Sequence, residues 1–213
     1  MRCSRRLAIV VGAVALLSGR AAAAGQDPSA SSSSGGGAAV ATLKFVAGGA
    51  VGLVVHESGH VALDLAFNAR PRIVPVHLGP APFFAITHRG GLSPRREYII
   101  DAAGFWMQGI GAERLFHEHP HLRTESAPFT KGEFAFDEIT AVGYGVVALA
   151  RTGPVQRDTY GMSYSSRVPE PAIGAMVLAP ALLDGYRYFK PESRWAVWAS
   201  RAAKVSTVLL VFK

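Results

Sequence analysis

Two histidines and a glutamate lie inside one of the most apolar stretches of the chain. Residues 51–65 read VGLVVHESGHVALDL, so that His56, Glu57 and His60 form the pattern H-E-x-x-H. On a helix, residues four apart share a face, and two imidazoles at this spacing can bind one Zn²⁺. The glutamate between them can act as a general base on a water at the metal. Because a charge buried in an apolar segment needs a partner, the pattern predicts a metal site rather than a hydrogen-bonded histidine pair in a core.

The same pattern occurs a second time in a different setting. His117, Glu118 and His121 also match it, but a proline lies at position 120 and the surrounding segment is polar. Proline breaks a helix interior, so the two imidazoles are not expected to share a helical face. We therefore expect a loop here, with at most a weak surface metal site that includes His119.

A zinc site of this kind needs a third protein ligand. Asp64 lies four residues beyond His60, but one ion does not easily meet three side chains stacked over about 12 Å of a single helix. We expect Asp64 to lie at a helix end or behind the ligands. The stronger candidate is Asp184 in PALLDGYR, whose alternative interpretation is an Asp-Gly turn that ends a helix. The chain has one cysteine, Cys3, which excludes a cysteine-based zinc site within one chain.

The composition indicates a membrane protein. Hydrophobic residues make up 49% of the chain and charged residues 17%, whereas a soluble domain usually has about 25% charged residues. The net charge of +7 is compatible with nucleic-acid binding. However, the basic residues lie between apolar runs, as they do in the cytoplasmic loops of membrane proteins. We expect a lipid bilayer as a partner and no nucleic acid.

The elements that must position the metal site are apolar helices. The expected fold class is an all-α polytopic membrane protein with about four transmembrane helices, at 38–67, 98–116, 169–189 and 195–212. Prolines and β-branched residues in 70–98 predict a small β-rich insertion between the first two core helices. The expected organisation is a signal peptide or signal anchor (1–24), a flexible linker (25–37) and a membrane-embedded domain (38–213).

Two of these motifs together resemble those of a known family. HESGH in one apolar helix, with Leu183-Asp184-Gly185 in a later one, resembles the site-2 proteases, the intramembrane zinc metalloproteases of peptidase family M50. The resemblance covers about residues 38–190. It implies that His56, His60 and Asp184 hold zinc and that Glu57 is the catalytic base. The implied activity is hydrolysis of peptide bonds in or near transmembrane segments of membrane protein substrates.

A weaker element of the resemblance lies in the second core helix. The family has a glycine there, followed four residues later by an asparagine that helps to bind substrate. Gly104 and Gln108 have this spacing, with glutamine in place of asparagine. The resemblance implies that both contribute to substrate binding.

A zinc ion shared by two helices constrains the topology. His60 and Asp184 both lie near the C-terminal ends of their helices, so these helices must run in the same direction. Residues 98–116 supply the one crossing between them, and 138–150, with 13 residues, is then expected not to cross. The positive-inside rule places the basic 70–98 and 186–194 segments in the cytoplasm and 117–138 outside. The site would face the cytoplasmic side of a bacterial inner membrane.

Two alternatives stay open. One is a non-proteolytic membrane protein of the same architecture that binds zinc or a partner protein, which the glutamine at position 108 favours. The other is a secreted soluble metalloprotease whose apolar helices pack in a core, against which the low charge content argues.

Overall fold

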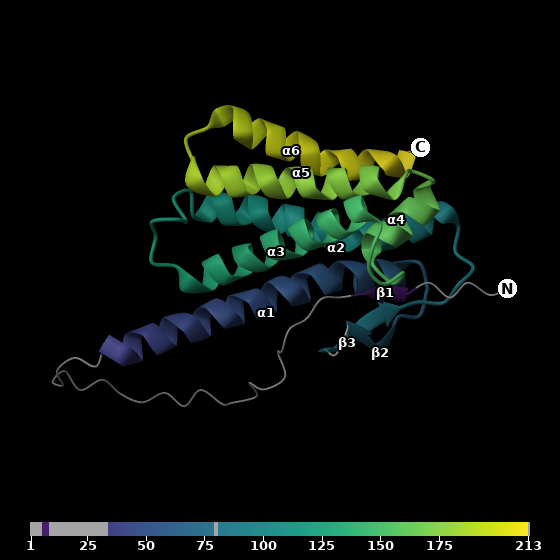
Figure 1. The fold of residues 1–213 in the computed structure, drawn as a ribbon, viewed down its shortest axis with the longest axis horizontal. Helices are drawn as coiled ribbons and strands as arrows, with labels where there is room; N and C mark the ends of the chain where they lie inside the picture. The colour runs from purple at the N-terminus through teal and green to yellow at the C-terminus, as the bar shows by residue number, and fades with distance from the viewer. Residues whose placement is uncertain (1–5, 9–33, 79–80, 213) are drawn as a thin grey trace.

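The computed structural model describes residues 6–8, 34–78 and 81–212, and it is predominantly helical. The chain order is β1 (Arg6–Ala8), α1 (Ser34–Ala66), β2 (Arg72–Leu78), β3 (Ala81–Thr87), α2 (Pro94–Glu118), α3 (Pro128–Ala150), α4 (Asp158–Ser166), α5 (Glu170–Phe189), α6 (Arg194–Leu209) and the 3₁₀ turn η1 (Leu210–Phe212). Figure 1 shows α1, α2, α3, α5 and α6 stacked as a bundle of long helices, with α4 and the strands at one end. The prediction of a mainly helical fold is confirmed.

The first long helix carries the H-E-x-x-H pattern and begins earlier than expected. α1 has 33 residues and starts at Ser34, so the last four residues of the predicted linker are helical. Residues 25–33 of that linker lie outside the described residues. So does the predicted signal peptide or anchor, except for β1.

The expected β-rich insertion between the first two core helices is present. β2 and β3 form an antiparallel hairpin in which Val74 pairs with Ala85, and β1 pairs with the other side of β3. The insertion ends before residue 98, because α2 already begins at Pro94. Ser93 caps this helix by accepting a hydrogen bond from the backbone N–H of Arg96 at 3.4 Å. Proline at the first helical position suits such a start.

Residues 138–150 do not form the short segment of their own that the sequence predicted. They are the second half of α3, which has 23 residues and runs the length of the bundle (Figure 1). The first half looks polar in sequence, but its acidic side chains face the protein interior. Glu133, for example, is buried and accepts a hydrogen bond from Arg114 of α2 at 2.7 Å. Polar residues that are paired inside a bundle do not interrupt a helix.

The full-length α3 reverses the predicted relation between α1 and α5. Two long helices, α2 and α3, now lie between them in the chain, and α1 and α5 run in opposite directions (Figure 1). The loop after α5 therefore lies at the same end of the bundle as the loop after α2, where His121 Nε2 is 3.9 Å from Glu192 Oε1. The basic segments 70–98 and 186–194 thus lie at opposite ends of the bundle. The predicted orientation placed both segments in the cytoplasm, so the 186–194 segment no longer supports it.

A glycine pair lets α1 and α3 cross with their backbones in contact. A Cβ atom on Gly48 would collide with the carbonyl oxygen of Phe129, and one on Gly132 would collide with the carbonyl oxygen of Phe45. Small residues of this kind allow close helix approach. This crossing fixes the position of α3 beside the helix that carries the histidines.

Among the described residues, two helical segments are long and apolar enough to cross a membrane. They are Gly36–Ala66 and Arg194–Phe212. Two of the four predicted spans, 38–67 and 195–212, meet this criterion, whereas α2 and α5 form long helices that do not.

Candidate metal centre

The two histidines of the pattern are buried side by side on one face of α1. His56 is 1% exposed and His60 is fully buried, and their Nε2 atoms are 3.3 Å apart. The four-residue spacing on a helix is sufficient to produce this arrangement. The sequence prediction that these two imidazoles converge therefore agrees with the structure.

The third member of the cluster is Asp158, at the start of α4. Its Oδ2 atom is 3.2 Å from His56 Nε2 and 3.6 Å from His60 Nε2, and the residue is fully buried. These three residues form a group that could hold a metal ion. Asp158 is not among the ligands expected from the sequence.

The spacing of the three donor atoms suits a tetrahedral zinc ion. Zinc lies about 2.0–2.2 Å from imidazole nitrogen and carboxylate oxygen, which places two donors of one tetrahedron about 3.3–3.5 Å apart. The three separations here, 3.2, 3.3 and 3.6 Å, are close to that value. The donor set of two imidazoles and one carboxylate also matches a zinc site that keeps a fourth position for a small ligand.

A backbone contact orients His60 for this role. Its Nδ1 lies 2.7 Å from the carbonyl oxygen of Ile100 in α2, so Nδ1 carries the proton and donates it to that oxygen. A neutral His60 then turns a lone pair on Nε2 toward the Asp158 oxygen. In this tautomer Nε2 is available to a metal ion, and hydrogen bonds to the other ring nitrogen commonly orient metal-binding histidines in this way.

Glycines let α2 approach the histidines without a gap. A Cβ on Gly104 would collide with Nε2 of both His56 and His60. Gly59, inside HESGH, faces the backbone of Ala103, where a Cβ would lie 2.7 Å from the carbonyl oxygen. Gly104, predicted to bind substrate, thus lies directly against the metal-binding atoms.

Asp158 is held in place through its neighbour in sequence. Arg157 is 6% exposed, and its guanidinium donates hydrogen bonds to Glu170 Oε1 at 2.7 Å and to the carbonyl oxygens of Gly153 and Pro154. These contacts fix the turn that leads into α4. Burial would raise the pKa of the Asp158 carboxyl, but His60 and His56 lower it, and the net result is a lowered pKa. The side chain is therefore ionised, as a ligand must be.

Glu57 lies beside the cluster with its carboxylate free. It is 8% exposed, Oε1 is 4.0 Å from His56 Nε2, and neither oxygen has a hydrogen-bond partner among the described residues. The edge of Phe105 packs on His56 with ring centroids 5.5 Å apart. A carboxylate of this kind, poised near three ligand atoms in an apolar setting, can accept a proton from a molecule bound there.

Asp184, the predicted third ligand, is not brought to the histidines. Its carboxylate accepts hydrogen bonds from Arg187 Nη1 at 2.9 Å and from Ser200, and it pairs with Lys204 Nζ at 2.7 Å. α5 passes the level of the site at Leu178, which contacts Gly145, the neighbour of Tyr144, whose ring centroid is 6.4 Å from that of His56. Asp184 lies almost two helical turns further along, about 9 Å at 1.5 Å per residue.

The other predicted polar residues lie around the centre. Asp64 is fully buried two residues before the end of α1, a helix-end position that agrees with the prediction, and its electrostatic neighbours are His88 and Glu97. Gln108 is 5% exposed and comes close to the imidazole of His56. It is thus near the cluster but outside the group of ligand atoms.

The second H-E-x-x-H match does not form a helical pair. α2 ends at Glu118, and His119 Nδ1 is hydrogen-bonded to the carboxylate of Glu125, which lowers the pKa of that carboxyl. Within the described part of the chain, His117, His119 and His121 do not belong to any group of three metal-binding side chains. The prediction of a loop at Pro120 is confirmed.

Nothing in the local sequence distinguishes Asp158 as a ligand. It lies in a polar, turn-rich stretch, and an aspartate in the first turn of a helix is a common helix-stabilising residue. It is also far from His60 in the chain, so no spacing rule joins the two. Its position depends on how α4 packs against α2, where Gly161 lets the helix approach Asp101.

The chain matches no family model, no curated protein and no solved structure.

Proposed function

We propose that this protein is a zinc-dependent endopeptidase that hydrolyses peptide bonds in or near transmembrane segments of other proteins. The observation that carries the proposal is the convergence of His56 Nε2, His60 Nε2 and Asp158 Oδ2 at 3.2–3.6 Å beside the unpartnered carboxylate of Glu57. Three ligands with an adjacent acid are the arrangement that metal-assisted hydrolysis needs. Asp158 takes the ligand role that the sequence resemblance implied for Asp184.

The residues of the chain have separate tasks in this reaction. When zinc is bound, it supplies Lewis-acid polarisation of the scissile carbonyl. Glu57 accepts a proton from the attacking water at a carboxylate oxygen and delivers it to the leaving amine. The Ile100 carbonyl keeps His60 in the tautomer with a free Nε2, and Phe105 shields His56 on one side.

A structural zinc site is the second candidate, and the depth of burial favours it. His60 and Asp158 are fully buried, and structural zinc sites are closed, with four protein ligands. Glu57 would then be the fourth ligand rather than a base. This corresponds to the alternative of a non-proteolytic membrane protein that binds zinc.

Exposed apolar surface supports a membrane location. Only 17% of the most apolar window of Gly36–Ala66 is buried inside the protein, whereas the core helix of a soluble protein would be mostly buried. We propose that α2, α3 and α5 are embedded beside α1 and α6, since all five are packed in one bundle.

The arginines favour one orientation, although the basic segment 186–194 lies at the other end of the bundle. The end that carries the β-hairpin, the start of α2 and the turns around α4 is rich in arginine: Arg70, Arg72, Arg89, Arg95, Arg96, Arg151, Arg157 and Arg167. By the positive-inside rule this end faces the cytoplasm. His60 and Asp158 lie toward the same end, so the centre would face the cytoplasmic side of a bacterial inner membrane.

Zinc content tests the ligand set. We expect about one zinc per chain in detergent-purified wild type, and its loss in His56→Ala and Asp158→Asn, because each removes one of three protein ligands. Asp184→Asn is the matched control and should keep its zinc. Zinc retained in Asp158→Asn but lost in Asp184→Asn would restore the ligand set that the sequence resemblance implied and contradict the one proposed here.

Glu57→Gln separates the two candidate functions. The peptidase proposal expects this variant to keep its zinc but to lose all cleavage of apolar transmembrane-segment peptides, followed by mass spectrometry. If Glu57 is instead a fourth ligand, Glu57→Gln weakens zinc binding, and wild type and variant are equally unable to cleave. That result would reject the peptidase.

A further inference from the structure

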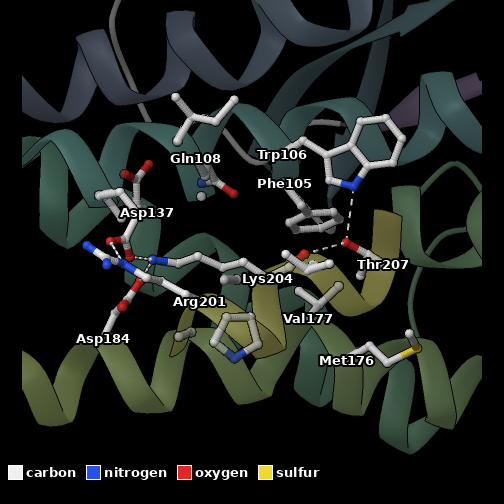
Figure 2. A pocket seen from close by; sticks show the side chains of 18 of the residues that line it. Phe105, Trp106, Gln108, Asp137, Met176, Val177, Asp184, Arg201, Lys204 and Thr207 are labelled. Atoms are coloured by element: carbon white, nitrogen blue, oxygen red, sulfur yellow. Dashed lines mark hydrogen bonds and ion pairs between the residues drawn. The ribbon is translucent and has the colours of Figure 1, made fainter. Parts of the chain in front are cut away.

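A cavity lies next to the metal centre and is not used by the ligands. It occupies about 670 Å³ between α2, α3, α5 and α6, within the range of roughly 300–1,000 Å³ that is typical of ligand sites. One part of its wall is apolar, and Figure 2 shows Phe105, Trp106, Met176 and Val177 around it. The other part is charged.

Two of the acids at the charged end are already neutralised. Glu113 accepts hydrogen bonds from Arg201 Nε at 2.8 Å and Lys204 Nζ at 2.6 Å, and it also pairs with Arg187. Asp184 pairs with Lys204 and Arg187. The three cations and two acids thus form one connected network, in which Lys204 pairs with both acids; Figure 2 shows Lys204, Arg201 and Asp184 of this network close together.

Two further acids on the cavity wall have no cation of their own. Asp137 is 7% exposed and lies near Gln108, and its Oδ1 has no hydrogen-bond partner in the part of the chain that the structure describes. Glu138 follows it in α3 and also lines the cavity, and no ion pair joins either residue to a cation among the described residues. Counting the network, four carboxylates face three cations, so the cavity has an excess of negative charge when all are ionised.

A neutral polar group near the two acids is also without a partner. Gln108 is 5% exposed, and its amide lies near His56 and Asp137, although neither its nitrogen nor its oxygen is within hydrogen-bonding distance of a partner among the described residues. In Figure 2 its amide points from α2 into the cavity. Buried polar atoms are usually hydrogen-bonded, so an unpaired amide that faces a cavity indicates a ligand with polar groups of its own.

The cavity adjoins the metal centre through two residues. Phe105 and Gln108 both line it. On their other side, Phe105 packs edge-on against His56, and Gln108 comes close to the same imidazole. A molecule in the cavity would thus lie one side-chain layer from His56.

We propose that this cavity binds an apolar peptide segment of the substrate through one lysine or arginine side chain, whose cation Asp137 and Glu138 neutralise. The apolar wall accepts neighbouring side chains, and Gln108 hydrogen-bonds the peptide backbone. Burying a cation in an apolar cavity is unfavourable unless an anion is there to pair with it, and here two are. This inference rests on the proposed peptidase function, because it identifies the substrate class of the same site.

Trp106 makes binding measurable without catalysis. The chain has two other tryptophans, Trp195 and Trp198, which are exposed on α6 and can be replaced by phenylalanine. In this background, with Glu57→Gln to prevent cleavage, the fluorescence of Trp106 reports cavity occupancy in non-ionic detergent. The probes are three matched apolar peptides with lysine, norleucine or glutamate at one central position.

The expected result is selective binding of the lysine peptide. We expect it to bind about 30-fold more tightly than the norleucine peptide. Norleucine lacks the ammonium group and leaves the buried carboxylates unpaired, and truncating one partner of a buried charge pair typically costs affinity of this size. The double variant Asp137→Asn/Glu138→Gln should abolish this difference in affinity. If the double variant does not fold, Glu138→Gln alone is the test, and it should reduce the difference. Glu192→Gln is the control, because the Glu192 side chain is 87% exposed. It should leave the difference in affinity between the two peptides unchanged.

Three outcomes would overturn the inference. They are equal binding of the lysine and norleucine peptides, a preference that survives in the double variant, and tight binding of dodecylamine with no preference among the peptides. The last would assign the cavity to a lipid-like amine. Selective peptide binding with no cleavage by the Glu57-containing protein would reject the peptidase but leave the cavity assignment intact.

Discussion

At the scale of single residues, the metal centre depends on the absence of a side chain at position 104. Gly104 lies against both imidazoles, and a methyl group there would occupy the space of their Nε2 atoms. We expect Gly104→Ala to weaken zinc binding by about 10–100-fold, the range seen when groups that orient metal ligands are changed. Zinc titration of detergent-purified protein measures this.

Gly109→Ala is the control for this substitution, because it lies on the same helix. A Cβ at Gly109 would be 3.6 Å from the Lys204 side chain, an ordinary contact. Alanine favours helix over glycine by up to about 1 kcal/mol, so neither substitution should weaken the helix itself. Equal zinc affinity in the two variants would mean that the imidazoles can move away from α2.

At the scale of elements, the crossing of α1 and α3 sets where α3 lies. We expect Gly132→Ala to lower the free energy of unfolding by about 1–3 kcal/mol, the usual cost of overpacking, because its methyl group would collide with the Phe45 carbonyl. Gly143→Ala, with nothing within 4 Å, should not destabilise. Thermal unfolding in detergent, followed by circular dichroism, compares them, and similar shifts would argue against the close crossing.

At the scale of the whole molecule, α1 and α6 lie on opposite outer faces of the bundle (Figure 1). Both expose large apolar side chains, among them Val54 at 64% and Trp198 at 66%. We expect the protein to stay in the membrane pellet after an alkaline carbonate wash, because such surface is unfavourable in water. Release into the supernatant would support the alternative of a soluble metalloprotease.

The sequence alone determined the part of the centre that lies within one helix. His56, Glu57 and His60 are brought together by helix geometry, so their types and spacing were enough to predict their arrangement. The β-rich insertion and the loop at Pro120 were predictable for the same reason, since prolines and turn residues act on the chain locally.

Only the tertiary structure decided which acid joins the histidines. The choice between Asp158 and Asp184 depends on the direction of α5, and that direction depends on whether α3 crosses the bundle. The first half of α3 looked like a loop because it is rich in acids, and the local sequence does not reveal that these acids face the bundle interior, where Glu133 pairs with Arg114. Contacts between distant segments, not local propensity, determine which acid lies beside the histidines.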